Sequence, residues 1–302
     1  MPMKHTLPEL FKTEPCVLAP EIYDCASAHA VELCGYQATV LSGAELAMAQ
    51  LGVPDLGLLS LDESIAATRR ICNFSSLPMV VDAENGYGPP LNTYNACKAY
   101  AKAGAGGVII VDSPETRVGG ALPFEQALEK YRAAAAALKG TDCILVARTD
   151  VPDDLDEPIW RCQKYREAGA DMTLVFMINY LEAKDRFDAC KRIAEKDKGW
   201  KWYPDLGAHD GKSDVTLEEI APYGFNFVGI HYLLGSAMKA MIDCGEHNYV
   251  NKNNVYFYDK YNYSALTDKK INEHWIGIEQ SFCVTEEEKE AVRMRWPYYG
   301  MH

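Results

Sequence analysis

The sequence contains no pair of cysteines at the close spacing that binds zinc or carries out thiol redox chemistry. Its ten cysteines are scattered along 302 residues, and no two of them are separated by only two residues. Neither a zinc site nor a thioredoxin-like motif is therefore indicated. Unpaired thiols at irregular spacing are typical of a reducing compartment, so we expect a cytoplasmic protein.

Long apolar runs and an excess of basic residues are missing as well. No stretch reaches the roughly 18 consecutive apolar residues of a membrane span, and the N-terminus MPMKHTLPELFKTEP lacks the apolar core of a secretory signal. The formal net charge is −13, and an acidic surface repels nucleic-acid phosphates and anionic lipids. We therefore expect no nucleic-acid or membrane partner, and a small anionic substrate would need a locally positive site.

What the sequence does contain is an alternation of short apolar runs with longer amphipathic segments. Runs that are apolar almost throughout are typical of parallel strands buried on both faces. The eight runs begin at Cys16, Ala38, Pro78, Gly107, Cys143, Met172, Trp200 and Phe225.

The segments between these runs predict helices, for example over residues 60–74, 91–105, 123–140 and 157–170. Two of them end in AGAG and AGAD, where a glycine can adopt the left-handed conformation that closes a helix. An open doubly wound sheet uses the same alternation, but its glycine fingerprint is absent. We therefore predict an α/β protein with a (β/α)8 TIM barrel.

The pattern changes after about residue 245. A tyrosine- and asparagine-rich stretch is followed by two helix-like segments, and Thr285 is a plausible N-cap for the second. No linker rich in proline, glycine or serine precedes them. We predict that residues 1–245 form the barrel and that residues 246–302 form a C-terminal helical extension. It would pack on the barrel or on a neighbouring subunit, within one domain overall.

Polar residues gather where the predicted strands end. In a (β/α)8 barrel these ends meet at one face, where active sites form, and a buried polar side chain there is costly unless it is paired or functional. The polar strand ends are Ser42 with Gly43, Asp82, Glu84, Asp112, Arg148, Thr149, Asp150, Tyr203, Asp205 and His231.

Asp82 and Glu84 are separated by one residue, a spacing that places both carboxylates on one face of a strand. Two neighbouring carboxylates repel each other unless a cation or a proton lies between them. Oxygen ligands suit Mg²⁺. The alternative is a pair of solvated loop acids. The GYG that follows favours a ligand site, because glycines let the backbone turn closely around a ligand.

Arg148 and His231 each follow an apolar run. A guanidinium at the end of a buried strand needs an anion and binds a carboxylate or phosphate through two hydrogen bonds. A structural ion pair of Arg148 with Asp150 or Asp112 is the alternative, and both roles can coexist. His231 could be a general acid or base, or a donor to a substrate carbonyl, with a purely structural histidine as the alternative.

Four segments of this chain resemble a known family. The sequence TVLSGAELAMAQLGVPDLGLLSLDE, then VDAENGYGPPLNT, AGAGGVIIVDS and ARTD follow one another in the order and with the spacing of the isocitrate lyase and phosphoenolpyruvate (PEP) mutase superfamily. The resemblance extends from about Glu21 to about Cys244. It implies a (β/α)8 barrel enzyme and a homotetramer in which C-terminal helices exchange between neighbours.

The resemblance also implies a metal site. Asp82 would be a direct ligand of Mg²⁺, or of Mn²⁺ in its place, with Glu84 beside it. Asp55, in GVPD, would be a loop acid that reaches the metal or its waters.

For the substrate, the resemblance implies that Ser42, Gly43 and Ala44 line the carboxylate end and that Arg148 clamps the molecule. Tyr23 and Asp24, in IYDCASA, would support the site. The segments WKWYPD and VGIHY are similar to strand ends of the oxaloacetate decarboxylases of the superfamily, which implies that Tyr203 and His231 lie near the substrate.

Three departures from the family pattern stand out. Glu84 replaces the usual aspartate, and the fourth strand ends in Val111-Asp112 where the family has Glu-Asp. Asp112 cannot simply replace the missing glutamate, because neighbouring strand residues face opposite ways. The loop Thr116–Gly120 has no cysteine, histidine or lysine, whereas the isocitrate and methylisocitrate lyases carry a cysteine acid there.

The missing cysteine favours decarboxylation over retro-aldol cleavage, because decarboxylation of a 2-oxo acid requires fewer groups from the protein. We expect a Mg²⁺-dependent decarboxylase or carbon–carbon lyase that acts on a small 2-oxo or 2-hydroxy acid such as oxaloacetate, through an enolate. The alternatives are a phosphonopyruvate-type carbon–phosphorus mutase or hydrolase and a metabolite-binding barrel without turnover.

Overall fold

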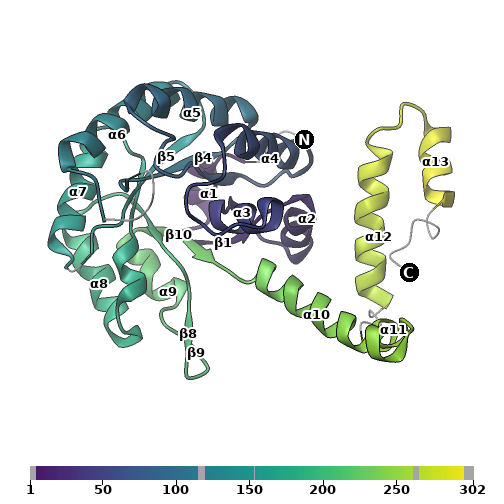
Figure 1. The fold of residues 1–302 in the computed structure, drawn as a ribbon. Helices are drawn as coiled ribbons and strands as arrows, with labels where there is room; N and C mark the ends of the chain where they lie inside the picture. The colour runs from purple at the N-terminus through teal and green to yellow at the C-terminus, as the bar shows by residue number, and fades with distance from the viewer. Residues whose placement is uncertain (1–4, 115–119, 153, 261–264, 296–302) are drawn as a thin grey trace. The chain divides into compact units, whose positions relative to one another are not determined.

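The computed structural model describes residues 5–114, 120–152, 154–260 and 265–295. Eight parallel strands close into a barrel (Figure 1), which confirms the predicted architecture. Each predicted apolar run overlaps one of these strands. In their order around the barrel they are β1 (Val17–Ile22), β2 (Thr39–Leu41), β3 (Met79–Asp82), β4 (Gly107–Val111), β5 (Ile144–Thr149), β6 (Met172–Val175), β7 (Trp200–Tyr203) and β10 (Phe225–Ile230).

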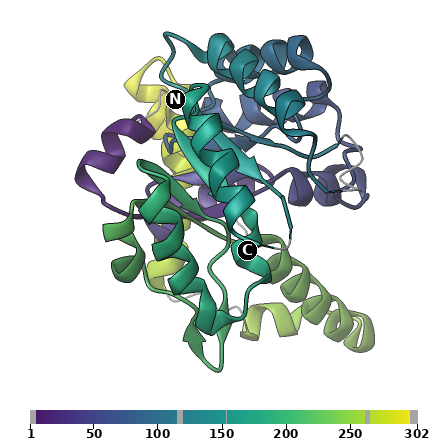
Figure 2. The same cartoon turned by 90° about the vertical axis from the view of Figure 1, so that its left-hand side faces the viewer.

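Helices connect the strands and surround the barrel. A two-stranded hairpin, β8 (Ala208–His209) and β9 (Lys212–Ser213), follows β7 and projects from the barrel in both views (Figure 1, Figure 2). The helices up to β10 are α1 (Leu7–Thr13), α2 (Cys25–Cys34), α3 (Gly43–Leu51), α4 (Leu61–Phe74), α5 (Pro90–Ala103), α6 (Phe124–Leu138), α7 (Asp156–Glu167), η1 (Phe176–Tyr180), α8 (Ala183–Lys196), α9 (Leu217–Ile220) and η2 (Ala221–Tyr223).

Local capping explains where several of these helices begin and end. The Asp24 carboxylate accepts a hydrogen bond of 2.7 Å from the Ser27 N–H at the start of α2. Ser60 plays the same part for α4. The two predicted glycine stops are also confirmed, because Gly104 and Gly169 have φ angles of +103° and +111°.

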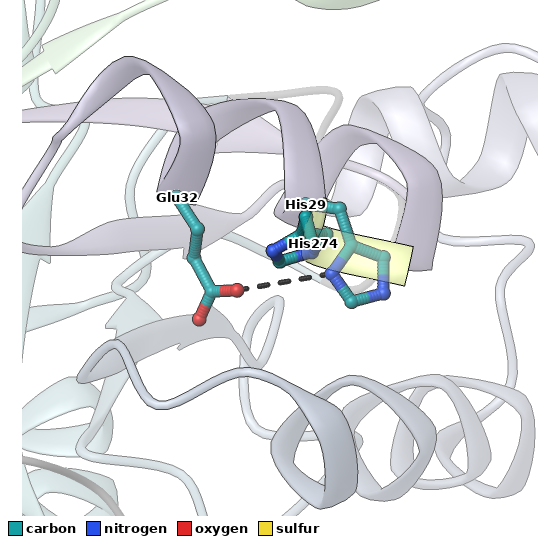
Figure 3. A group of neighbouring side chains, drawn as sticks. All are labelled: His29, Glu32 and His274. Carbon is teal, nitrogen blue, oxygen red and sulfur yellow. Dashed lines mark ion pairs between the residues drawn. The ribbon is translucent and has the colours of Figure 1, made fainter. Parts of the chain in front are cut away.

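Glu32 anchors α2 to the chain that follows α4. One of its carboxylate oxygens accepts hydrogen bonds of 2.8 Å from the Ser75 hydroxyl and the Ser76 N–H. The other lies 3.7 Å from Nδ1 of His29, one turn earlier in the same helix (Figure 3). The contacts with Ser75 and Ser76 connect α2 to the chain between α4 and β3.

The interior of the barrel is filled by apolar side chains, and α1 closes its amino-terminal end. Leu7, Leu10 and Phe11 of α1 belong to the same buried cluster as the inward-facing residues of the strands. The Phe11 ring meets Trp200 and Phe227 edge to face, with centroid distances of 5.1 and 6.3 Å. Because α1 covers the amino end, a ligand site is expected at the carboxyl ends of the strands.

The chain after β10 is helical, as predicted, and forms α10 (Leu233–Asn251), α11 (Val255–Lys260), α12 (Ala265–Gln280) and α13 (Glu286–Arg295). Contacts divide the chain into two compact units, Met1–Leu234 and Gly235–His302. The change of pattern near residue 245 falls inside α10, so the single domain with a boundary at 245 stays a prediction. Thr285 caps α13 by accepting a hydrogen bond of 3.1 Å from the Glu288 N–H.

Among the described helices, none is both long enough and apolar enough to pass through a membrane.

Candidate active site

Strand alternation turns four polar side chains into the barrel, above the apolar interior. Three of them lie in strands and the fourth, Ser42, follows β2 directly. Residues two apart in a strand face the same way, so the polar layer can be counted from the core. The four pairs of core residue and polar neighbour are Ala19 and Glu21, Val40 and Ser42, Val80 and Asp82, and Val146 and Arg148.

These four side chains line one cavity of about 330 Å³ at the carboxyl ends of the strands. Polar residues that are far apart in the sequence therefore lie around the same cavity. A wider surface hollow of about 710 Å³ lies between α1 and α6 at the amino ends of the strands, on the face that α1 closes. The other residues of the inner cavity are Val40, Ala44, Asp55, Ile109, Leu174, Phe176, Asn179, Trp202, Pro204, Asp205 and His231.

His231 is held between two carboxylates of the cavity wall. Its Nε2 lies 2.8 Å from Glu21 Oε2, and its Nδ1 lies 3.1 Å from Asp205 Oδ1. Burial alone would lower the pKa of the imidazole, but the hydrogen bonds to Asp205 and Glu21 outweigh burial and raise this pKa to about 10. At neutral pH His231 is therefore an imidazolium that donates from both nitrogens, and it has no lone pair with which to act as a base.

Arg148 forms the structural ion pair that its sequence position left open, and it also lines the cavity. Its Nε and Nη2 donate to the two carboxylate oxygens of Asp150, over 2.6 and 2.8 Å. The guanidinium carbon also lies 3.7 Å from the ring centroid of Phe176. The planar group is thus fixed along one edge and across one face while it lines the cavity.

Asp82 and Glu84 converge on the start of α3. The Glu84 N–H donates to Asp82 Oδ1 over 2.8 Å. A β-carbon on Gly43 would lie 2.7 Å from Glu84 Oε1 and 3.2 Å from Asp82 Oδ2, so only glycine fits between them. Since β3 ends at Asp82 and Glu84 has a φ of +52°, a turn rather than the strand face brings Glu84 here.

The charges around the cavity favour a bound cation. Four carboxylates line it, and two cationic side chains oppose them among the described residues. An anionic substrate would be repelled by this excess of acids unless a divalent ion compensated it. Carboxylate oxygens are the ligands that Mg²⁺ and Mn²⁺ prefer. The residues present therefore fit such an ion at Asp82, with Asp55 in the cavity lining and Glu84 hydrogen-bonded to Asp82 as candidates for further oxygen ligands.

The remaining predicted residues divide between the cavity and its surroundings. Ser42 and Ala44 line the cavity at the start of α3, where the helix N-terminus favours an anion. Tyr23 is half-buried beside the start of α2, where its N–H donates to the Ser27 hydroxyl over 3.1 Å. Asp24 caps that helix, and neither residue is among those that line the cavity.

Tyr203 does not lie where its predicted contact with the substrate requires. It is fully buried on the outer face of β7 among aliphatic residues, and its hydroxyl donates to Asp214 over 2.8 Å. The inward position of this strand belongs to its neighbour Trp202. We therefore remove Tyr203 from the set of residues that could contact a ligand.

Several cavity residues carry no signal that we used in the sequence. Glu21 is the first charged residue after the apolar run that begins at Cys16, but we did not apply that signal there. Asn179 and Phe176 follow β6 in a short 3₁₀ helix, and Trp202 looks like an ordinary core residue. Glu45, in the first turn of α3, is buried. Its burial and the nearby charge of Glu21 raise the pKa of Glu45 to about 7.

The cysteine-less loop Thr116–Gly120 lies outside the described residues except for Gly120. Its lack of a thiol acid is therefore known from the sequence alone. Val111, which replaces the family glutamate, is buried at the end of β4, and Asp112 faces away from the cavity onto Arg161, as strand alternation requires.

A closed barrel whose acids and arginine share one cavity at the carboxyl ends of its strands is the architecture of a (β/α)8-barrel enzyme. The family model described as phosphoenolpyruvate phosphomutase matches residues 7–244. The chain therefore belongs to the phosphoenolpyruvate phosphomutase family, within the isocitrate lyase and PEP mutase superfamily. This confirms the predicted membership and enzyme class.

Individual relatives agree with this assignment. The petal death protein of Dianthus caryophyllus is 36% identical over 235 residues, which are 74% of this chain and 71% of that protein. An oxaloacetate decarboxylase of Paraburkholderia xenovorans is 30% identical over 176 residues, 56% of this chain and 59% of that protein. A crystal structure of 2,3-dimethylmalate lyase superposes with a TM-score of 0.73 at 25% identity, covering 82% of this chain and 87% of that one.

Proposed function

We propose that this chain is a Mg²⁺- or Mn²⁺-dependent lyase that breaks a carbon–carbon bond of a small 2-oxo acid of the oxaloacetate type. The observation that carries the proposal is the convergence of Asp82, Arg148 and the start of α3 on one cavity. A relative named oxaloacetate decarboxylase supports the choice of substrate class. The absence of a cysteine acid in the loop Thr116–Gly120 supports decarboxylation over retro-aldol cleavage.

Asp82 would hold the divalent ion, with oxygen ligands or water contacts from Asp55 and Glu84. When bound, such an ion polarises the 2-oxo group and stabilises negative charge on its oxygen.

Arg148 binds the carboxylate next to the 2-oxo group, because its guanidinium is fixed in plane by Asp150 and matches a carboxylate through two hydrogen bonds. The N-terminal N–H groups of α3, at Gly43 and Ala44, are further donors for this end of the substrate. Together these contacts orient the substrate so that its second carboxylate leaves as CO₂ and the electron pair passes into the enolate.

His231 contributes a fixed positive charge. Because Glu21 and Asp205 hold its imidazolium, it lowers the energy of the negative charge that develops on the enolate without exchanging a proton itself. A proton from water then reaches the enolate carbon, so that oxaloacetate and one proton give pyruvate and CO₂.

The test is pyruvate formation from oxaloacetate, corrected for the metal-catalysed background without protein. We expect turnover with Mg²⁺ or Mn²⁺, loss of turnover with EDTA, and a decrease on the order of 10²-fold or more in Asp82→Asn, as is typical when a main electrostatic contact is removed. Asp210→Asn changes an aspartate in the exposed β8–β9 turn and should leave turnover unchanged.

Pyruvate formation that is equal in Asp82→Asn and in the unchanged protein would contradict the proposal. A second candidate follows from the matched family model, whose description names a phosphomutase. Conversion of phosphonopyruvate with no reaction of oxaloacetate would favour this carbon–phosphorus chemistry instead.

We further propose that the chain works as a homotetramer in a reducing compartment such as the cytoplasm. All ten cysteines lie in the described residues, and all ten are free thiols. In α10 none of the 19 residues, each of which the structure describes, is buried, and its exposed side chains include Met238, Met241 and Ile242. Apolar side chains exposed along one helix favour its use as a subunit contact.

A further inference from the structure

Asp112 is a buried acid that the proposed reaction does not use. It follows β4 directly, its exposed fraction is 1%, and its side chain points away from the cavity toward α7. A carboxylate at such a position is costly unless several donors satisfy it. Two of the groups that donate hydrogen bonds to Asp112 lie in the residues directly after Arg148.

The Asp112 carboxylate accepts four hydrogen bonds. Oδ1 accepts from the Asp150 N–H over 2.9 Å. Oδ2 accepts from the Thr149 hydroxyl over 2.7 Å, the Tyr165 hydroxyl over 2.9 Å and Arg161 Nη1 over 3.2 Å. Two of the four donors thus come from consecutive residues directly after Arg148.

The backbone of Asp112 adds a contact to Arg148 itself. Its N–H donates to the Arg148 carbonyl oxygen over 3.1 Å. The same carbonyl accepts a second hydrogen bond, of 2.8 Å, from the hydroxyl of buried Tyr131. Asp112 therefore forms hydrogen bonds with the main chain of residues 148 and 150 and with the side chain of Thr149.

Asp150 carries this restraint into the cavity. Its main chain is fixed by Asp112, and its carboxylate binds the Arg148 guanidinium along one edge, through Nε and Nη2. Once that edge is fixed, the direction of the other N–H groups of the guanidinium is determined, because the group is planar.

We propose that Asp112 is a positioning residue that sets the orientation of the Arg148 guanidinium through Asp150. The proposal rests on the proposed function only in assigning the substrate carboxylate to Arg148. The superfamily pattern has a glutamate at the position of Val111. Because valine offers no carboxylate to the cavity, this end of β4 acts on the site through Asp112, whose carboxylate faces outward.

The test is a double-mutant cycle on kcat/KM for oxaloacetate with Asp112→Asn and Arg148→Ala. Asparagine keeps the shape of the side chain, but its NH₂ group cannot accept the hydrogen bonds that one of the Asp112 carboxylate oxygens accepts. Because a displacement of about 1 Å in a positioning group can lower rates on the order of 10²-fold, we expect Asp112→Asn to lower kcat/KM by about 10- to 100-fold, mainly through KM. In the Arg148→Ala background the same substitution should change kcat/KM less than twofold.

Tyr165→Phe is the matched control. It removes another donor from the same carboxylate oxygen without touching residues 148–150, so it should lower the melting temperature but leave kcat/KM within twofold. A loss of kcat/KM in Tyr165→Phe as large as in Asp112→Asn would mean that general loosening, and not positioning, is responsible.

A crystal structure of Asp112→Asn gives a readout that does not depend on activity. We expect the Arg148–Asp150 pair to be broken or displaced. An unchanged pair, or equal losses of kcat/KM with and without Arg148, would overturn the proposal. If the unchanged protein does not turn over oxaloacetate, the proposed function fails, while the crystal structure still decides the role of Asp112.

Discussion

At the residue scale, the charge state of the acids near the cavity depends on how deeply each one is buried. Glu45 is 6% exposed and lies near Glu21 and His231. Burial first, and then the charge of Glu21, raise its pKa to about 7, against a small opposing effect of His231. At neutral pH a substantial fraction of Glu45 is therefore protonated, close to the cavity acid Glu21.

This shift predicts a pH-dependent stability difference between the unchanged protein and Glu45→Gln. The folded-state pKa lies above the unfolded-state value, so the unchanged protein loses stability as the pH rises from about 4.5 to about 7, and no more above that. Urea unfolding should find Glu45→Gln more stable above pH 7, by no more than about 3.5 kcal/mol, and nearly equal in stability below pH 4.5. A difference that does not vary with pH would contradict this assignment.

Single residues also mark the limit of what the sequence could predict about the site. Asp82, Arg148 and His231 were found because each is the first charged residue after an apolar run. Tyr203 was misplaced because a shift of one residue along β7 exchanges the inside of the barrel for the outside. The two partners of His231 could not be predicted together, since they come from β1 and the end of β7 and meet only when the barrel closes.

At the scale of elements, the eight strands were predictable because each is buried on both faces and so reads as a short apolar run. Helix α1, which closes the amino end, was not predicted, because seven residues are too few to show a helical periodicity. Its apolar side chains also become buried only when the barrel has closed above them. The hairpin β8–β9 was missed for the opposite reason, since its exposed residues have no apolar pattern at all.

Helix α1 leads to a prediction about stability that is separate from activity. Phe11→Ala removes a ring that packs against Trp200 and Phe227 inside the barrel, so we expect a loss of about 3 kcal/mol in the free energy of unfolding. Because α1 lies at the end opposite the cavity, kcat/KM should be unchanged. The matched control is Lys12→Ala, at an exposed neighbour, which should stay within about 0.5 kcal/mol. A large change in KM for Phe11→Ala would show that the two ends of the barrel are coupled.

At the scale of the whole molecule, the helical chain after β10 predicts self-association. Sedimentation equilibrium of the full chain should give a mass near four times 33.6 kDa. Met241→Glu and Ile242→Glu place charges on α10, whose residues are not buried within the chain, and should shift the mass toward that of one chain while the circular dichroism stays the same. A chain that sediments at 33.6 kDa without substitution would contradict the proposed tetramer.

The most direct test of the central claim, that one cavity holds a cation and an anion together, is a crystal structure with Mn²⁺ and oxalate. The anomalous signal of Mn²⁺ identifies the cation without reference to activity. The account predicts a peak within coordination distance of Asp82, with a carboxylate group of oxalate hydrogen-bonded to Arg148 in the same cavity. A peak elsewhere on the protein, or oxalate bound away from Arg148, would contradict it.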